Sequence, residues 1–164
     1  MRKAQIQAQI FVYILMIVIV ALVLVYGYKA IADFGKKSQQ IDLIESKAMI
    51  KNAIEKNSGY RVIKKVDVTL PSAFTYICFV SSALVREGNN NIPSLSAVDY
   101  PVIYDSVGSK YNRNMFFFPD GTESMDVGEI EVDGGFLCFR KVNGIVTLRL
   151  EGQGGSVKVK EWLG

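Results

Sequence analysis

The stretch IFVYILMIVIVALVLVY, residues 10–26, decides how this 164-residue chain is organised. It contains no charged residue and no glycine. Extended by Gly27 and Tyr28, it would form a helix of roughly 28 Å, close to the ~30 Å hydrocarbon core of a bilayer. Each apolar residue contributes about −0.3 to −0.6 kcal/mol to insertion. The sequence therefore predicts one transmembrane helix, in preference to the buried core helix of a soluble protein, with the lipid bilayer as its partner.

The helix is expected to continue beyond the membrane. Residues 29–56 mix polar and apolar side chains and are rich in Ala, Lys, Glu and Gln, which favour helix. No proline occurs before Pro71, so nothing forces an earlier break. The run Asn57-Ser58-Gly59 is a typical C-terminal helix signal. We therefore predict that residues 29–59 extend the helix outside the membrane.

Apolar side chains lie on two opposite sides of this extension, given a turn of about 100° per residue. One stripe comprises Phe34, Ile41, Ile44 and Ala48, and the other comprises Leu43, Ile50 and Ile54. One stripe should pack on the chain's own globular part. The other needs either a neighbouring subunit or a second element of the same domain, and the sequence leaves both possibilities open. Phe34 and Ile41 are the candidate assembly residues on the first stripe.

From residue 60 onward the signals change from helix to strand. Residues 66–70 alternate at period two, residues 74–80 are apolar on both faces, and 156–163 contain a last strand. Further strands are expected at 114–118, 128–132, 136–142 and 145–151, with a short edge strand at 100–104 and a loop at 87–94. Asn143-Gly144 predicts a two-residue hairpin turn. These signals predict one mostly antiparallel sheet of about five to seven strands.

The expected fold class is therefore α+β. A long N-terminal helix, transmembrane in its first half, packs by its second half on a mostly antiparallel β-sheet domain, residues 60–164. The helix is the natural cover because a sheet needs one face buried.

The sequence shows no catalytic constellation, and we expect neither an enzyme nor a cofactor or metal. Histidine, the commonest general base and metal ligand, is absent. The carboxylates between residues 120 and 133 lack EF-hand spacing and predict a solvated rim. The glycines of 152–155 precede no helix and predict a turn or bulge. The run Phe116-Phe117-Phe118 must place aromatics on both faces of a strand, so at least one is an interface candidate.

The net charge of +3, without a long basic run, excludes nucleic acid as an expected partner. The two cysteines, Cys78 and Cys138, lie in strand-like runs far from the membrane segment. A disulfide in an exported domain is the preferred interpretation, and it would close a loop of about 60 residues. The alternative is a pair of buried free thiols in a cytosolic domain.

The N-terminus, MRKAQIQAQIF, resembles the class III signal peptide of type IV pilin-like proteins, particularly archaeal ones. In that family a prepilin peptidase removes a short basic leader and leaves the hydrophobic helix in the mature subunit. The resemblance implies cleavage between Ala4 and Gln5, so that residues 1–4 are the leader and 5–28 the transmembrane helix. It also implies a prepilin peptidase-like processing enzyme and self-association or other pilin-like subunits as partners. An ordinary secretory signal fits less well, because no small-x-small cleavage site follows Tyr26.

One position departs from the family's pattern. Archaeal pilins often carry Glu at the fifth mature position, where the carboxylate is thought to pair with the N-terminal amine of a neighbouring subunit. This chain has Gln9 there, which can accept a hydrogen bond but cannot form the ion pair. Gln9 is therefore a candidate assembly residue, and its neutrality favours a minor subunit or an anchored protein.

Two functions follow from these observations. The first is a membrane-anchored, type IV pilin-like structural subunit, a pilin or minor pilin, of a surface filament or related assembly. The second is a single-pass anchored surface protein whose β domain binds a ligand or partner without polymerising. In both, the protein lies in the cell membrane with its β domain extracellular. The leader and the cysteines support that orientation, whereas lysines on both sides of the segment leave the positive-inside count ambiguous.

Overall fold

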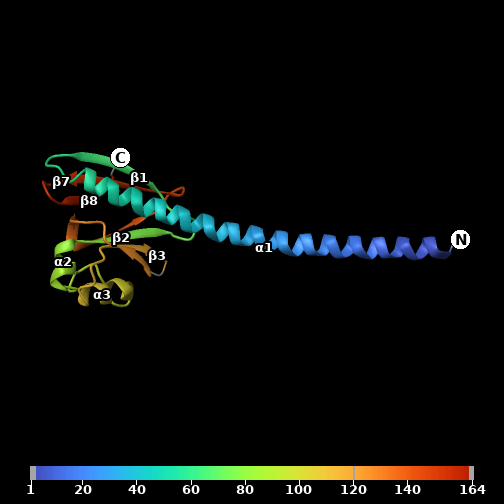
Figure 1. Ribbon diagram of the computed structural model, residues 1–164. Coiled ribbons are helices and arrows are strands. Elements are labelled where there is room, and N and C mark those ends of the chain that lie inside the picture. Colours follow the sequence, from blue (N-terminus) through green and yellow to red (C-terminus); the bar gives the residue numbers. More distant parts are fainter. Residues whose placement is uncertain (1–2, 120, 163–164) are drawn as a thin grey trace. The chain divides into compact units, whose positions relative to one another are not determined.

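The computed structural model describes residues 3–119 and 121–162 and has an α+β fold (Figure 1). The chain divides into two compact units, Met1–Gln40 and Ile41–Gly164. The second unit is called the head below. Helix α1 (Lys3–Lys56) contributes residues to both units, and its residues in the head pack on β-sheets. The expected fold class, a long N-terminal helix packed on a mostly antiparallel β structure, is confirmed.

Hydrogen bonds to carbonyl groups of the last turn and of the residues after it fix the end of α1. Asn57 Nδ2 donates to the carbonyl oxygen of Ala53 at 2.6 Å. The carbonyl oxygen of Ser58 accepts the backbone N–H groups of Gly154 and Gly155, at 3.0 and 3.1 Å. The predicted end of the helix at 57–59 is confirmed. The glycine-rich segment 152–155 is a turn, as expected, and its N–H groups form the hydrogen bonds to Ser58, just after the helix.

In the described part of the chain, eight strands form two four-stranded sheets in place of the single sheet expected. Sheet A has the order β1-β7-β8-β5 and sheet B the order β4-β3-β2-β6. Neighbouring strands pair antiparallel, except β5 and β8, which are parallel. The bounds are β1 (Ile63–Thr69), β2 (Tyr76–Val80), β3 (Met115–Phe118), β4 (Glu123–Met125), β5 (Ile130–Val132), β6 (Phe136–Arg140), β7 (Ile145–Gly152) and β8 (Val157–Glu161).

Strands β2 and β3 of sheet B are buried on both faces, which explains their continuous apolar runs. Ile77 and Phe79 of β2 face one core, shared with sheet A and α1, whereas Val80 faces a second core. In β3, Phe117 lies in the first core and Phe116 in the second. All three phenylalanines of the 116–118 run are at most 4% exposed. The expectation that one of them serves an interface is therefore wrong within this chain, because both faces of the strand are covered.

Two short helices, α2 (Ser82–Glu87) and α3 (Pro101–Gly108), cover the second face of sheet B. Residues 100–104 were expected to form an edge strand, and this prediction is wrong. Pro101 occupies the start of α3, where its missing N–H costs nothing. Ile103 and Val107, one helical turn apart, are then both fully buried. A single 3-10 turn, η1 (Asp133–Gly135), connects β5 to β6.

The two-residue turn at Asn143-Gly144 is confirmed, but the predicted hairpin is not. The φ angles of 51° and 85° are those that such tight turns require. Val142 and Ile145 exchange backbone hydrogen bonds of 2.8 and 3.0 Å across the turn. Beyond this bridge the strands separate, because β6 pairs with β2 in sheet B and β7 pairs with β1 and β8 in sheet A. The turn therefore joins two sheets.

Side-chain hydroxyl groups occupy both edges of sheet A, where strand backbone groups need other partners. At the β1 edge, Ser46 Oγ of α1 donates to the carbonyl oxygen of Thr69 at 2.6 Å. At the β5 edge, the N–H of Ile130 donates to Ser82 Oγ at 2.9 Å. Further along the same edge, the N–H of Val132 donates to Ser81 Oγ. These contacts hold α1 and the start of α2 against the sheet.

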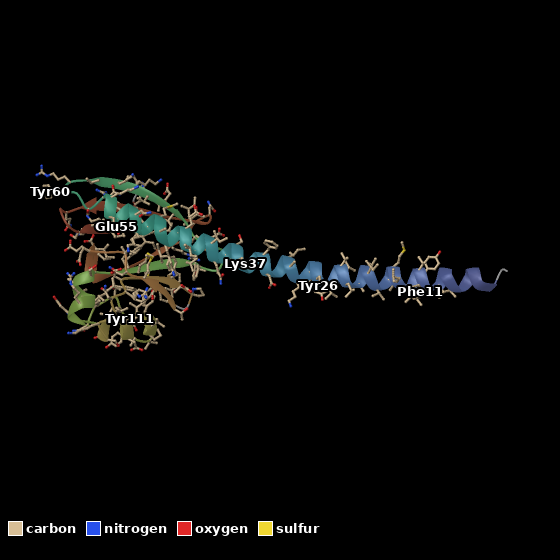
Figure 2. The ribbon with its side chains drawn as sticks, viewed as in Figure 1. Phe11, Tyr26, Lys37, Glu55, Tyr60 and Tyr111 are labelled. Carbon is tan, nitrogen blue, oxygen red and sulfur yellow. A yellow bond between two sulfur atoms is a disulfide. The ribbon has the colours of Figure 1, made fainter. Side chains whose placement is uncertain are left out.

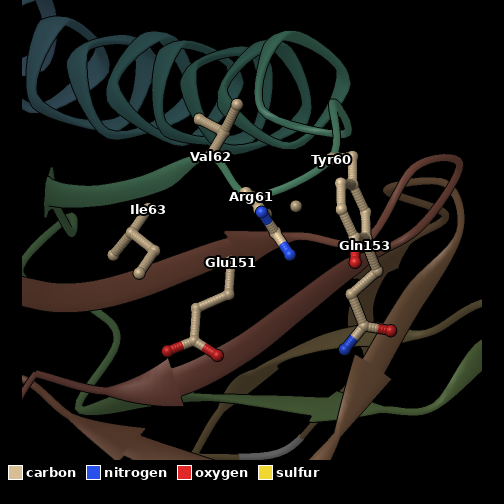
Figure 3. Close-up of a pocket in the computed structure, with 7 residues that line it drawn as sticks. Tyr60, Arg61, Val62, Ile63, Glu151 and Gln153 are labelled. Carbon is tan, nitrogen blue, oxygen red and sulfur yellow. The ribbon is translucent and has the colours of Figure 1, made fainter.

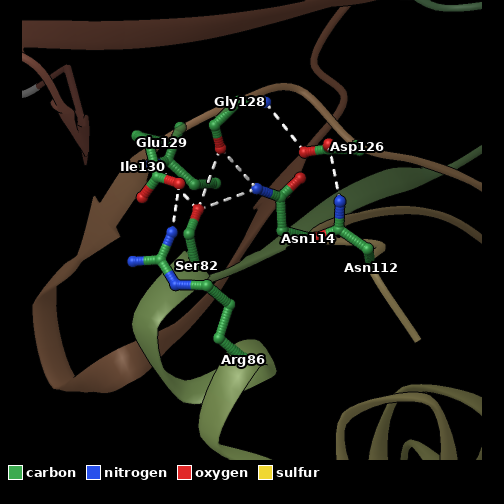
Figure 4. A network of polar contacts seen from close by, with 8 residues as sticks. All are labelled: Ser82, Arg86, Asn112, Asn114, Asp126, Gly128, Glu129 and Ile130. Carbon is green, nitrogen blue, oxygen red and sulfur yellow. Dashed lines mark hydrogen bonds and ion pairs between the residues drawn. The ribbon is translucent and has the colours of Figure 1, made fainter. Parts of the chain in front are cut away.

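Asn114, which is only 3% exposed, lies at the centre of a polar network between the sheets (Figure 4). Its Nδ2 donates to the carbonyl oxygen of Gly128 at 2.7 Å and to Ser82 Oγ at 3.0 Å. Its Oδ1 accepts the N–H of Val127 at 2.9 Å. Asn114 immediately precedes β3, and residues 127–128 lie just before β5, one residue from its start. The network therefore connects sheet B, sheet A and α2 by buried hydrogen bonds.

Candidate functional site

The first candidate surface is the apolar segment of α1, residues 10–26 (Figure 2). Its large apolar side chains are exposed, from 49% at Leu15 to 69% at Ile17 and Tyr26. Among the described residues, α1 is the one helix long and apolar enough to cross a membrane, by length and composition. Exposing apolar area to water costs about 25 cal/mol per Å². This surface therefore requires lipid, or other apolar helices, around it.

The residues that carry the leader resemblance lie at the start of α1. Met1 and Arg2 lie outside the described residues. Ala4, Gln5 and Gln9 belong to the helical backbone of α1, but their side chains are outside those the structure describes. Cleavage before Gln5 and a role for Gln9 in assembly therefore stay predictions.

The second candidate surface is the apolar stripe of α1 that comprises Phe34, Ile41, Ile44 and Ala48, called the outer stripe below. The inner stripe is the opposite one, which comprises Leu43, Ile50 and Ile54. Ile50 and Ile54 of the inner stripe are buried in the first core, at 1% and 2% exposure. Ile41 and Ile44 of the outer stripe are 62% and 67% exposed, so no element of the described head covers them. Phe34, in the first unit, is 74% exposed. Two partners were considered for the outer stripe, and the prediction that a second element of the same domain covers it is wrong.

The predicted disulfide between Cys78 and Cys138 is confirmed, and the free-thiol alternative is wrong. The two residues are direct partners in the antiparallel register of β2 and β6. Their Cα atoms are 4.0 Å apart, close to the short spacing of a non-hydrogen-bonded pair. The bond lies on the face of sheet B that α2 and α3 cover.

Three of the carboxylates between residues 123 and 133, those of Glu123, Glu129 and Asp133, pair with cations from distant segments. Glu123 lies 2.7 Å from Lys47 of α1, and Asp133 lies 2.5 Å from Lys158 of β8. The hydrogen bond from Lys158 lowers the pKa of Asp133. Asp120 lies outside the described residues. Within the described part, no three His, Cys, Asp or Glu side chains are grouped so that they could hold a metal ion. The described carboxylates of this segment therefore form a solvated rim, and three of them are ion-paired.

An open cavity of about 680 Å³ lies where the chain passes from α1 into β1 (Figure 3). It is lined by Tyr60, Arg61, Val62, Ile63, Glu151, Gly152 and Gln153. The carboxylate of Glu151 is already paired, with Arg149 Nε at 2.7 Å and Lys160 Nζ at 2.9 Å. The hydrogen bond from Lys160 lowers the pKa of Glu151. Glu151 is therefore a poor proton acceptor at neutral pH.

No protein-family model, curated protein or solved structure matches this chain. The fold itself defines the class: an α+β protein with one candidate membrane-spanning helix and a disulfide-bonded head. Sequence reasoning identified the exposed stripe and the cysteine pair. It missed Ser81, Ser82 and Asn114, because a polar side chain in a loop or at a helix start gives no signal of distant partners.

Proposed function

We propose that this protein is a membrane-anchored, type IV pilin-like structural subunit, a pilin or minor pilin, of a surface filament or related assembly. The observation that supports the proposal is that the rest of the described chain covers α1 only in part. Its segment 10–26 is apolar and uncovered, and its residues in the head are covered on one side only, with Ile41 and Ile44 exposed. A subunit that moves from a membrane into a helical assembly needs both surfaces.

The physical argument rests on what can replace water around these surfaces. In the bilayer, lipid surrounds segment 10–26 and the helix acts as an anchor. In an assembly, the same apolar side chains pack against α1 of other copies, and the exposed isoleucines extend that contact along the helix. The Cys78–Cys138 disulfide supports an extracellular head, since disulfides persist in oxidising compartments. The leader resemblance supports removal of residues 1–4 and a prepilin peptidase-like processing enzyme.

The test begins with the mass of the protein recovered from its own membranes. A mature N-terminus at Gln5 supports the proposal, and retention of Met1 to Ala4 rules out processing by a prepilin peptidase. Assembly is then compared in two variants, Ile41→Asp and Ile63→Asp. The two isoleucines are similarly exposed, at 62% and 60%, but Ile63 lies at the start of β1. We expect Ile41→Asp to abolish filament recovery and Ile63→Asp to leave it unchanged.

Equal filament recovery from both variants would show that the outer stripe of α1 is no subunit contact. A correctly processed protein that is recovered only as a membrane-bound monomer supports the second function instead. In that case the protein is a single-pass anchored surface protein whose head binds a partner without polymerising.

A further inference from the structure

We propose that an open pocket binds the carboxylate group of an acidic ligand. The pocket lies on the second face of sheet B, the face on which α2 and α3 pack. The pocket has a volume of about 430 Å³ and is lined by Thr75, Tyr76, Tyr100, Cys138 and Arg140. Its residues come from β2 and the residue before it, from β6, and from the residue before α3. The inference is independent of the proposed assembly function, because no residue of α1 lines this pocket.

The strand register places the cation and one phenol on the same face. Tyr76 of β2 and Arg140 of β6 are direct partners in the antiparallel ladder, so their side chains leave the sheet side by side. The adjacent pair on that face, two residues along each strand, is the disulfide-bonded Cys78 and Cys138. A covalent bond next to the pair prevents the strands from slipping. The site is therefore built into the sheet.

Aromatic packing holds both tyrosine rings in place. The Tyr76 ring stacks on Phe118 with a centroid distance of 4.8 Å and an interplanar angle of 9°. The Tyr100 ring meets Phe118 and Phe136 edge-on, at 5.6 and 4.9 Å. Both phenylalanines are at most 5% exposed. Rings packed on a buried floor lose little conformational entropy when a ligand binds.

The polar groups at the pocket are donors. Burial raises the pKa of Tyr76, and the neighbouring Tyr100 raises it further, so the phenol stays protonated. Arg140 is exposed, and the ion pairs of the described head do not include it. A guanidinium group matches a planar carboxylate with two parallel hydrogen bonds. The Tyr76, Tyr100 and Thr75 hydroxyl groups add further donors.

The test is a titration of the full-length chain in detergent micelles with ¹³C-labelled tyrosine rings, at constant ionic strength. Acetate probes the shared carboxylate chemistry. Glucuronate and the α-amide of N-acetylglutamate represent a sugar acid and a peptide side chain, and glucose and the α-amide of N-acetylglutamine are their uncharged counterparts. We expect the charged probes to shift the Tyr76 and Tyr100 resonances saturably and the uncharged ones to leave them unchanged. The tighter of the two larger carboxylates identifies the source of the ligand.

Three variants sharpen the test. Arg140→Gln should weaken acetate binding by about tenfold or more, since it removes a charge-assisted hydrogen bond. Tyr76→Phe should weaken binding while leaving the ring stack intact. Arg61→Gln, the same change of charge in a different cavity, should leave binding unchanged. No saturable shift with acetate, equal shifts with the uncharged probes, or unaltered affinity in a folded Arg140→Gln protein would each overturn the proposal.

Discussion

The α-carbon of Gly152 faces the carbonyl oxygen of Gly59 with no room for a side chain between them. A β-carbon at position 152 would overlap this oxygen and also that of Asn57. The same backbones are hydrogen-bonded, since the N–H of Arg61 donates to Gly152 O at 3.0 Å and the N–H of Gly152 donates to Val62 O at 2.7 Å. The turn after α1 is thus held on the end of β7 by backbone alone, and only glycine allows so close an approach.

We therefore expect Gly152→Ala to lower the free energy of unfolding of the head by about 2 kcal/mol or more, because the overlapping atoms are backbone and must move. Gly59→Ala is the matched control. Its β-carbon would meet only Val62 Cγ2, at an ordinary 3.5 Å, so we expect a change within about 0.5 kcal/mol. Denaturant titrations followed by fluorescence of Trp162, the single tryptophan, measure both. Equal stability of the two variants would contradict the close approach.

The buried network at Asn114 gives a second prediction. Asn114→Ala removes both donors to Ser82 and Gly128 and leaves the buried N–H of Val127 without its acceptor. We expect a loss of about 2–4 kcal/mol in the free energy of unfolding, because each unsatisfied buried group adds its own desolvation cost. Asn112→Ala removes one exposed hydrogen bond to Asp126 and should cost less than about 0.5 kcal/mol. Similar losses in the two variants would refute a central role for Asn114.

Local signals in the sequence were enough to predict several elements of this fold. The apolar run 10–26 and the Asn57-Ser58-Gly59 signal predicted α1 and its end. The turn residues Asn143-Gly144 predicted the turn. In each case the physical cause is local: apolar length, helix termination or a positive φ angle. The cysteine pair was predicted from redox logic, and the β2–β6 register then accounts for it.

The division into two sheets could not be predicted in the same way. Strands β6 and β7 alternate alike, and nothing in their residues shows that one pairs with β2 and the other with β1. The contacts that separate the sheets are long-range, such as the hydrogen bond between Asn114 and Ser82, which are 32 residues apart. The site residues Tyr76 and Arg140 likewise come together only through strand register. Pairing of distant segments is a property of the packed chain and leaves no local pattern.

Acid should destabilise the head. The hydrogen bond from Lys160 lowers the pKa of Glu151 below its ordinary value, and that from Thr147 lowers the pKa of Asp67 in the same way. A carboxylate with a lower pKa in the folded state contributes stability above its unfolded pKa, and this is lost as pH falls through its folded pKa. We therefore expect the free energy of unfolding to decrease as pH falls from about 5 to about 3.

The variant Glu151→Gln tests the origin of this acid response. It keeps the shape of the side chain but cannot titrate, so the decrease in stability between about pH 5 and pH 3 should become shallower. Glu87→Gln, at the end of α2, is the control and should leave the pH profile unchanged. Thermal unfolding at a series of pH values provides the measurement. An acid response that is the same in wild type and Glu151→Gln would assign the effect to other groups.

The disulfide makes a prediction that combines mutation and reduction. Cys78 and Cys138 close a loop with a sequence separation of 60, for which chain entropy predicts a stabilisation of roughly 4 kcal/mol. The double variant Cys78→Ala/Cys138→Ala should therefore unfold at lower denaturant concentration than the oxidised protein. Reductant should lower the denaturant concentration at which the wild type unfolds toward that of the variant. It should leave the value for the variant unchanged. Free thiols in the purified protein, measured by mass under non-reducing conditions, would contradict the bond.

The same substitution should destabilise the head on one stripe of α1 and have little effect on the other. Ile50 is 1% exposed within the first core, so Ile50→Ala should lower the free energy of unfolding by about 2–5 kcal/mol. Ile44 is 67% exposed, so Ile44→Ala should change it by less than about 0.5 kcal/mol. If the outer stripe is a subunit contact, Ile44→Asp will reduce chemical crosslinking between copies in the membrane while unfolding of the head is unchanged. Loss of head stability in Ile44→Asp would instead show that this stripe is covered by the chain itself.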